Sequence, residues 1–523
     1  DFANLKDTFE KENKFQVNNT LWNFYQNKTG SSMYNPSVGP DGKQDNHYKE
    51  FNVNEVSWSE INTTEIASSI NEYNTAIMVI SRNGSEDGDT WFSTSECLDN
   101  NYLDLSFNEK SILDNLDSMR EQGKLDNLVL LLNTGTPMQM KNISKYTHID
   151  SCLWVGMGGN ASFNGIYDVV SGKVNPSGRL VDTYLYDNDS SPSVENTGAY
   201  QFDKYGALPQ ESRSSNAYNH AYIVYQEGIY VGYRYFDKVN KPVLYPFGYG
   251  LSYTTFEYSD LTVDEKGAHF TITNTGNFDG KEVAQMYIGL ENSKVFRPKK
   301  ELKGFIKVEL KKGESKKVTI PFDEYSFRYF NVKTNKWEVE EGDYTIYIGS
   351  SSQNILLTGS IHETGTTDVV PYDKEKLDVY YNGDVNDVSE NEFKELLGRE
   401  IPIGDIVFYK KNRVIVDYFT TVDQLRHARG WTGRFFSWAI RFAIKFLRGV
   451  GNPTLANTLI MGVQNQPMRA LSRMTGGAIH WGQLDGLITM FNGHFFKGLH
   501  QFNKAGREVK KAKKAEKTEK GAK

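Results

Sequence analysis

Residues 245–258 have the sequence YPFGYGLSYTTFEY, and the character of the chain differs on the two sides of this stretch. Before it, apolar runs alternate with helical patterns, whereas after it the apolar runs are short and separated by turn residues. Pro246, Gly248 and Gly250 disfavour a regular helix, and the aromatic side chains among them need an apolar surface to pack on. The stretch is therefore predicted to join two domains of different architecture.

The residues before this junction have the order of elements expected of a parallel α/β sheet. Helical patterns alternate with apolar runs, the helices at residues 66–73 and 108–122 and the runs at 75–81, 127–133 and 149–155. Short, continuous apolar runs are typical of parallel strands that are buried on both faces. Because ligands bind beyond the carboxyl ends of such strands, a functional site is expected in the loops after Ile80, Leu132 and Val155.

The residues after the junction predict an antiparallel β-sandwich and then helices. Short alternating segments bounded by turn residues lie at residues 268–274, 282–290, 302–310, 315–321, 337–339 and 342–349. Residues 364–378 are expected to form a linker, and Ser389 with Glu392 predicts the capping box of a short helix. Residues 431–448, WTGRFFSWAIRFAIKFLR, predict a cationic amphipathic helix, followed by helical sequence to residue 502 without a strand pattern.

Length and composition indicate the number of domains, the state of the cysteines and the character of the C-terminal tail. The 523 residues suffice for about two to four domains with cores of their own. The two cysteines, Cys97 and Cys152, are predicted to be ordinary thiols, with a single bridge as the alternative. The formal net charge of -7 conceals a basic tail, since residues 504–523 hold nine Lys or Arg against three Glu. We expect this tail to be disordered, with contact to nucleic acid or an anionic membrane as the alternative.

The loop after the first predicted strand, SRNGSEDGD at residues 81–89, is acidic. Glu86, Asp87 and Asp89 lie close together at the predicted carboxyl end of that strand. Clustered carboxylates raise one another's pKa, and a general acid that works near neutral pH needs a raised pKa. A solvated acidic turn and a cation site are the alternative interpretations, although the calcium-loop pattern is absent from the sequence.

Several motifs in the chain, taken in order, resemble glycoside hydrolase family 3, the β-glucosidase and β-xylosidase family. They are SRNGSEDGD (81–89), NTGTPMQM (133–140), NPSGRL (175–180), GIYVGYRYFD (228–237), PFGYGLSYTTFEY (246–258) and RPKKELKGF (297–305). FKELLGREIP at residues 393–402 resembles a helical extension of some members. The resemblance implies a parallel α/β sandwich domain, an antiparallel fibronectin type III-like β-sandwich and a helical C-terminal extension.

This resemblance divides the chain into five expected segments. Residues 1–245 correspond to the α/β domain of the family, without its first strand, and residues 246–361 to the fibronectin type III-like domain. A linker with a short helix at residues 362–402, a helical extension at 403–503 and the basic tail at 504–523 are expected to follow.

The family also suggests roles for the residues of the acidic loop. In its members, the matching loop carries the general acid/base Glu in a Gly-Glu-Gly-x-Asp setting. The resemblance therefore implies Glu86 as the general acid/base and Asp89 as support for the loop. It further implies substrate binding by Arg82 and Asp87.

The sequence departs from the family pattern in the acidic loop and beyond it. Ser85 and Asp87 stand where glycines are usual, and Gln139 stands where an acidic residue is common. The nucleophilic Asp of the family lies in a separate β/α barrel of about 200 residues or more, and this sequence contains no pattern for such a barrel. A barrel in the same polypeptide or in another chain is therefore expected to be the partner of these domains, with loss of the barrel as the alternative.

We expect a β-glucosidase-like glycoside hydrolase that cleaves terminal β-linked sugars by retaining double displacement, inactive without the barrel. Its expected substrate is an oligosaccharide or an aryl β-glycoside, and its expected source is a bacterium, in the cytoplasm or at the cell envelope. The alternative is a carbohydrate-binding or scaffolding protein without catalysis. No cofactor, metal or nucleic-acid partner is expected, because phosphate-loop, dinucleotide and zinc patterns are absent. The amphipathic helix at residues 431–448 is expected to pack on the body or on the barrel, with peripheral contact to an anionic membrane as the alternative.

Overall fold

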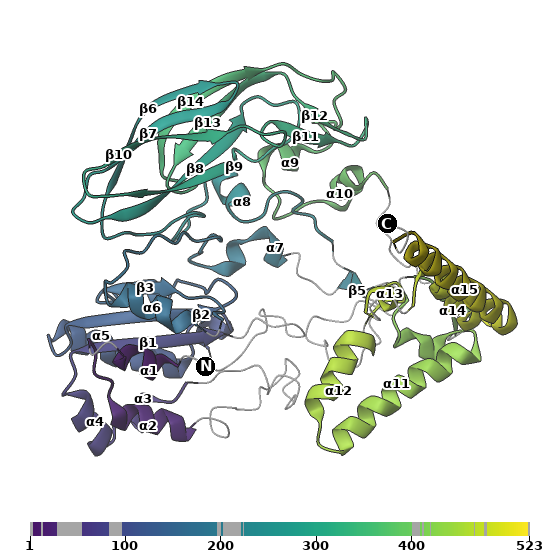
Figure 1. Ribbon diagram of the computed structural model, residues 1–523, viewed down its shortest axis with the longest axis horizontal. Coiled ribbons are helices and arrows are strands. Elements are labelled where there is room, and N and C mark those ends of the chain that lie inside the picture. The colour runs from purple at the N-terminus through teal and green to yellow at the C-terminus, as the bar shows by residue number, and fades with distance from the viewer. Residues whose placement is uncertain are drawn as a thin grey trace. The chain divides into compact units, whose positions relative to one another are not determined.

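The structure is a computed structural model that describes most of the chain. The described residues are 4–11, 14–28, 55–82, 97–159, 161–195, 200–201, 221–222, 224–399, 408–410, 413–418, 420–464, 466–474 and 479–520. They belong to two compact units, and each has an apolar core of its own (Figure 1). The first unit comprises Asp1–Gly198 and Ile223–Ile401, and the second comprises Ala199–Tyr222 and Pro402–Lys523.

A parallel sheet of three strands organises the first half of the first unit. Its strands are β1 (Thr75–Arg82), β2 (Asn127–Thr134) and β3 (Ser151–Trp154), in the spatial order β1-β2-β3. Successive side chains of a strand point to opposite faces, and both faces of this sheet are apolar. Ile80 and Leu130 belong to the core on one face, and Val129 and Leu131 belong to the core on the other.

Helices cover both faces, as strands that are apolar on both sides require. The face of Ile80 packs against α2 (Asn19–Lys28), α3 (Trp58–Ile61), α4 (Thr64–Ile70) and α5 (Phe107–Glu121). The face of Val129 packs against α1 (Leu5–Glu10) and α6 (Ser162–Val170). The predicted parallel α/β architecture is therefore confirmed.

Antiparallel sheets form the second half of the first unit, which confirms the predicted β-sandwich. One sheet has the order β10-β7-β6, with β6 (Phe256–Asp264), β7 (Gly267–Asn274) and β10 (Ser315–Pro321). The other has the order β14-β13-β8-β9, with β8 (Gly280–Leu290), β9 (Glu301–Leu310), β13 (Gly342–Gly349) and β14 (Ile355–Glu363). A hairpin of β11 (Arg328–Asn331) and β12 (Lys336–Val339) completes this half.

The junction stretch, residues 245–258, is held firmly between the two halves. Gly248 N donates to Leu180 O over 2.8 Å, and Leu180 N donates to Tyr249 O over 2.8 Å. On the side of the sandwich, the Gln285 amide donates to Gly248 O over 3.1 Å and to Ser350 O over 2.6 Å. These contacts tie the backbone of the junction to both halves of the first unit.

From Leu377, near the end of the linker expected at residues 364–378, the chain packs on the rest of the first unit. Leu377 and Tyr380, at the start of α9 (Asp378–Asn382), are 1% and 0% exposed, and Tyr380 Oη donates to Gln226 O over 2.8 Å. Their apolar surface is the physical reason for this packing. The helix predicted after Ser389 is present as α10 (Glu390–Leu397), with the capping box formed.

The second unit is mainly helical in its described part. Its helices are α11 (Trp431–Gly449), α12 (Pro453–Leu459), α13 (Ala470–Met474), α14 (Trp481–Phe491) and α15 (Phe495–Lys520). The helix predicted at residues 431–448 is α11. A pair of short strands that the sequence did not indicate, β15 (Phe408–Lys410) and β16 (Arg413–Val414), precedes the helices.

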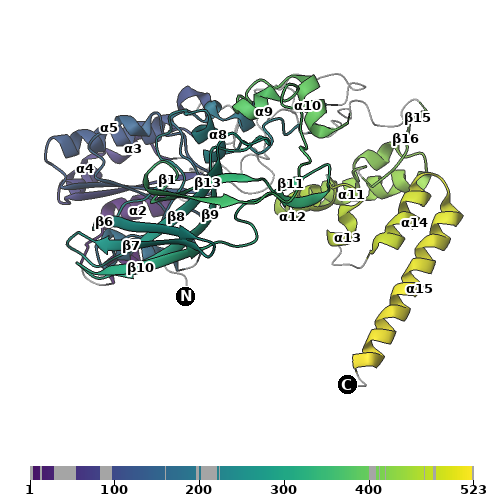
Figure 2. The same cartoon turned by 90° about the horizontal axis from the view of Figure 1, so that it is seen from above.

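The basic tail differs from its expected disorder, because α15 continues to Lys520 beyond α14 (Figure 2). Residues 504–520 are rich in Ala, Lys and Glu, which have high intrinsic helix propensity, and this composition outweighs their like charges. Within the part of the chain that the structure describes, no helix is both long and apolar enough to cross a membrane.

Substitution of Gly248 tests how much the hydrogen bonds of the junction contribute to the stability of the first unit. Its φ is +83°, and a Cβ added there would lie 2.0 Å from Gln285 Oε1. Gly248→Ala should therefore displace the Gln285 amide and destabilise the first unit by several kcal/mol, roughly the cost of left-handed strain plus lost buried hydrogen bonds. Thermal unfolding followed by circular dichroism measures this loss.

Gly123→Ala is the matched control. Gly123 has a φ of +69°, but a Cβ added there meets nothing within 4 Å. It should cost about 1 kcal/mol from backbone strain alone. Equal losses from the two substitutions would show that the Gln285 contact contributes nothing to the junction.

Candidate functional site

Arg82 anchors the carboxyl end of β1. Its guanidinium forms a double ion pair with Glu109, in which Nη1 and Nη2 each lie 2.7 Å from a carboxylate oxygen. Nε donates to Tyr102 O over 2.7 Å, Nη1 to Ser81 O over 2.8 Å and Nη2 to Asp104 O over 2.5 Å. A guanidinium has five N–H donors, and these contacts occupy all of them.

The contacts of Arg82 are those of a buried structural residue, although the family resemblance implied that it binds substrate. The residue is 6% exposed and has no donor left for a sugar hydroxyl. The carboxylate of Glu109 raises the pKa of Arg82 further above its usual range, so the side chain remains charged although it is buried. Arg82 is therefore a structural anchor.

Glu109 is fixed in turn by the start of α5. Ser106 Oγ accepts from Glu109 N over 3.1 Å, and Ser106 N donates to Glu109 Oε2 over 2.7 Å, which completes a capping box. The Arg82 pair thus joins the end of β1 to the first turn of α5. The Ser-x-x-Glu pattern at residues 106–109 is a sequence signal for the start of α5, but it does not reveal the pairing of Glu109 with Arg82.

The acidic loop runs between two such fixed ends. Arg82 precedes residues 83–96, and Cys97, which follows them, forms an antiparallel bridge with Ser106. Leu98 N donates to Leu105 O over 2.8 Å beside that bridge. Both ends of the segment are therefore held near the amino terminus of α5.

The three predicted carboxylates of the site, Glu86, Asp87 and Asp89, lie outside the described residues. Their roles remain predictions. The structure does describe Arg82 and Cys97, the residues on either side of this segment.

Asp104 is the centre of a second buried network at this edge. It accepts from Gln139 Nε2 over 2.8 Å, from Asn142 Nδ2 over 2.7 Å and from Leu105 N over 2.7 Å. Burial raises the pKa of Asp104, while these three donors oppose that shift. A carboxylate in place of Gln139 would face Asp104, so the amide found here suits this network, although the family pattern favours an acid.

The other strand ends carry little that is both exposed and ionisable. After β2, Met138, Gln139 and Met140 are at most 2% exposed, so this loop is part of the core. Trp154 Nε1, at the end of β3, donates to Thr134 O over 2.9 Å. Met157 beyond β3 is 68% exposed and is apolar. Asp104 and Glu109 are buried and hydrogen-bonded, so neither is available to a substrate.

Glu55 lies beside the same helix start. Its carboxylate accepts from Tyr25 Oη over 3.0 Å and from Val56 N over 2.7 Å, and its carbonyl accepts from Asn108 Nδ2 over 2.7 Å. Burial, and to a smaller extent the charge of Glu109, raise the pKa of Glu55 to about 7, although the hydrogen bonds from Val56 N and Tyr25 Oη oppose this shift. Glu55 therefore titrates near neutral pH, but its hydrogen bonds are those of a structural contact.

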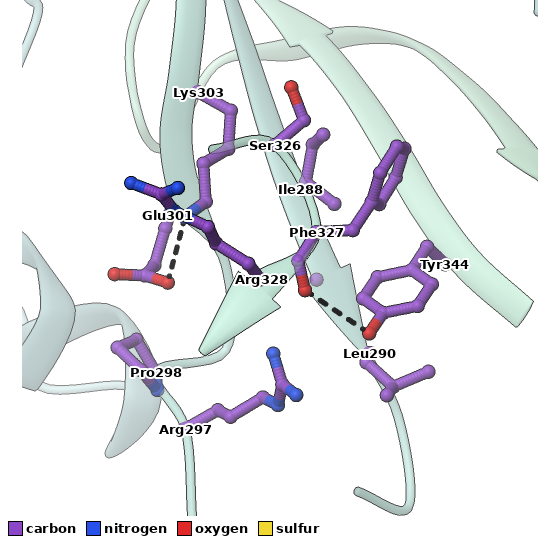
Figure 3. Close-up of a pocket in the computed structure, with 11 residues that line it drawn as sticks. Ile288, Leu290, Arg297, Pro298, Glu301, Lys303, Ser326, Phe327, Arg328 and Tyr344 are labelled. Atoms are coloured by element: carbon purple, nitrogen blue, oxygen red, sulfur yellow. Dashed lines mark hydrogen bonds and ion pairs between the residues drawn. The ribbon is translucent and has the colours of Figure 1, made fainter. Parts of the chain in front are cut away.

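A hollow in the sandwich half is a poor substrate site. Arg297, Lys303 and Arg328 lie around it (Figure 3), and its empty volume is about 280 Å³ including open solvent. Lys303 lies 3.5 Å from Glu301, and Arg297 lies 3.0 Å from Glu340, so these cations already have partners. All its lining residues belong to the sandwich.

Two further observations concern metals and thiols. Among the residues that the structure describes, no group of three or more His, Cys, Asp or Glu side chains is arranged to hold a metal ion. Cys97 is buried and Cys152 is exposed, and neither forms a disulfide.

Arg82→Lys tests whether Arg82 is an anchor. A lysine keeps the charge but has three N–H donors at one atom, so acceptors around Glu109 lose their partners. We expect a loss of about 2 to 4 kcal/mol in the free energy of unfolding. Arg120→Lys is the control, because Arg120 makes a similar two-point contact with Asp150 at the surface and should change stability little. Equal effects would contradict the anchoring role.

Glu55 gives a prediction about pH. Its folded-state pKa of about 7 exceeds the ordinary value of 4.5, so between these values the folded state keeps a proton that the unfolded state loses. Stability must therefore fall as pH rises from about 4.5 to about 7. Glu55→Gln should flatten this fall in melting temperature, whereas Glu121→Gln, at an exposed position, should not. Parallel profiles for the wild type and Glu55→Gln would refute the assignment.

Comparison with family models identifies both halves of the first unit. Residues 5–253 match the glycosyl hydrolase family 3 C-terminal domain. Residues 282–352 match the fibronectin type III-like domain. The first match contains the parallel α/β sheet and its helices. The second match covers the central part of the β-sandwich.

Relatives that are named β-glucosidases support the same conclusion. The chain is 40% identical over 245 residues to probable beta-glucosidase K of Emericella nidulans, covering 46% of this chain and 26% of that protein. It is 35% identical over 283 residues to thermostable beta-glucosidase B of Acetivibrio thermocellus, covering 53% and 34%. The chain thus spans about a quarter to a third of the length of these relatives. One relative is fungal and one is bacterial, so the bacterial source remains a prediction.

A solved structure agrees with these matches. The structure of beta-glucosidase 3B from Thermotoga neapolitana in complex with α-D-glucose aligns with a TM-score of 0.53 and 31% identity. The alignment covers 69% of this chain and 46% of that protein. Through its α/β domain and its fibronectin type III-like domain, the chain belongs to glycoside hydrolase family 3.

Proposed function

We propose that this chain forms the acid/base part of a retaining β-glycosidase that removes terminal β-linked sugars from oligosaccharides or aryl β-glycosides. The observation that carries the proposal is the match of residues 5–253 to the C-terminal domain of family 3, together with relatives that are named β-glucosidases. The domain boundary near residue 245 and the roles of the loop residues belong to this proposal.

Glu86 is the general acid/base in this mechanism. It donates a proton to the glycosidic oxygen of the leaving group, and then removes a proton from the water that attacks the glycosyl-enzyme. Asp87 contacts the sugar, and its charge beside Glu86 favours the protonated form of the acid. Asp89 supports the loop. The anchored ends at Arg82 and Cys97 supply the fixed stems that a catalytic loop needs.

The nucleophile comes from a β/α barrel, in the same polypeptide or in another chain. A retaining site needs its two carboxyl groups about 5 to 5.5 Å apart, so the barrel has to bring its Asp to that distance from Glu86. In the described part of the strand edge, Asp104 and Glu109 are buried among hydrogen-bond donors. Their burial supports assigning the acid/base role to the acidic loop.

A second function, carbohydrate binding without catalysis, is favoured by one feature of the sequence. Ser85 and Asp87 occupy positions where the family has glycines, and side chains there change the space around Glu86. In this alternative, the two domains hold sugar or position another protein without turnover.

Substitution of Glu86 tests the proposal in the presence of a family 3 barrel. Glu86→Gln should lower kcat for a substrate with a poor leaving group by about a hundredfold to ten-thousandfold, because that group leaves only when protonated. Activity on a dinitrophenyl β-glycoside should fall far less, because this leaving group needs no proton. Added azide should restore turnover and give a glycosyl azide of retained configuration.

Asp87→Asn and Ser59→Ala serve as the comparison variants. Asp87→Asn should mainly raise KM and shift the acid limb of the pH profile, whereas Ser59→Ala, on α3, should leave both unchanged. Full activity of Glu86→Gln on the poor leaving group would rule out its acid/base role. Sugar binding by calorimetry without hydrolysis, even with a barrel present, would establish the binding function instead.

A further inference from the structure

The helix α11, labelled in Figure 1, has a row of aromatic residues along one face. Trp431, Phe435, Trp438, Phe442 and Phe446 are each 57% to 60% exposed. Their spacing of three or four residues places them one above another on the helix. The Trp438 ring lies 5.6 Å from the rings of both Phe435 and Phe442. We call these five residues the aromatic stripe.

The opposite face of α11 is packed on its own unit. Gly433, Ser437 and Ile444 are buried there. A Cβ at Gly433 would lie 2.7 Å from the Ala428 side chain and 3.2 Å from that of Phe491, so the helix approaches its neighbours closely. The aromatic stripe therefore faces away from the core of the unit that holds the helix.

Positive charge lies along one edge of the stripe. α11 contains Arg434, Arg441, Lys445 and Arg448 and no acidic residue. At about 100° per residue, these four positions fall between the stripe and the buried face, on one side of the helix. Arg441, Lys445 and Arg448 form no ion pair with any residue that the structure describes. The helix is thus cationic in a chain of net charge -7.

We propose that α11 binds the surface of an anionic lipid bilayer, with the aromatic stripe in the interface and the cationic edge on the headgroups. The stripe exposes on the order of 500 Å² of apolar area, at the upper end of the patches found on monomeric proteins. Trp and Phe favour the interfacial region, and basic side chains favour anionic headgroups. α11 lies in the plane of the surface and does not cross it.

A lipid surface fits these features better than a protein surface. The stripe has five similar rings and no single dominant anchor, and Trp431 and Trp438 contribute its only hydrogen-bond donors. Two copies of α11 would bring like charges together, whereas anionic headgroups complement them. This inference is independent of the proposed hydrolysis.

Vesicle co-sedimentation of the full chain tests the inference. Binding should be at least about tenfold stronger to phosphatidylserine-rich than to pure phosphatidylcholine vesicles, and should weaken between about 0.1 M and 0.5 M salt. The double variant Trp438→Ser, Phe442→Ser should lower vesicle binding about tenfold. The triple variant Arg441→Gln, Lys445→Gln, Arg448→Gln should abolish the preference for phosphatidylserine-rich vesicles.

Matched controls lie in the sandwich. Trp337→Ser removes a tryptophan that is 57% exposed, and glutamines at Lys281, Lys312 and Lys317 remove three exposed cations. Neither control should alter vesicle binding, and circular dichroism should show every variant folded. The proposal is overturned if the wild type ignores anionic vesicles, or if stripe and control variants bind equally. It is also overturned if ultracentrifugation shows a dimer that the stripe variant dissociates, without vesicle binding.

Discussion

The buried ion pair of Arg82 and Glu109 holds the part of the fold on which the proposed site depends. Both side chains are 4% exposed, and removing two charges from water is costly unless hydrogen bonds replace the hydration. Here every guanidinium N–H has an acceptor, and Glu109 also accepts from Ser106 N. The main effect of the pair is therefore to fix the end of β1 against the start of α5, and its net contribution to stability is smaller. It joins a strand end, a loop and a helix start at the place where the acidic loop departs.

A second buried ion pair connects the α/β half and the sandwich of the first unit. Arg179 Nη2 lies 2.6 Å from Glu282, and Tyr258 Oη donates to the other carboxylate oxygen over 2.9 Å. Burial raises the pKa of Glu282, while Arg179 and Tyr258 oppose that shift. Irregular backbone lacks the regular hydrogen bonds of a helix or strand, and buried charge pairs fix its course instead. Gly250 of the junction allows the close approach of Arg179, because a Cβ added there would lie 2.8 Å from Arg179 Nη1.

The sequence predicted the elements whose signals are local. Continuous apolar residues gave β1 and β2, and the Ser389–Glu392 pattern gave the start of α10. The sequence did not predict β14, because Gly359 interrupts the alternation of apolar and polar residues and the inner residues of the strand are only half-buried. The contacts of Arg82 could not be predicted for a different reason. Apart from the carbonyl of Ser81, its acceptors lie 20 to 27 positions away and include backbone carbonyls, which no local pattern reveals.

The separation of anchoring from chemistry is the property that makes the proposed site physically reasonable. A general acid must lie within hydrogen-bond distance of the leaving oxygen, and misplacement by about 1 Å can cost a hundredfold in rate. A residue that anchors the loop cannot also adjust to a sugar, because its donors are occupied. In the proposed site the two tasks therefore belong to different residues, with Arg82 and Glu109 buried and the acidic residues following Arg82 in the sequence. Such a division lets loop residues such as Ser85 and Asp87 diverge from the family while the stems stay in place.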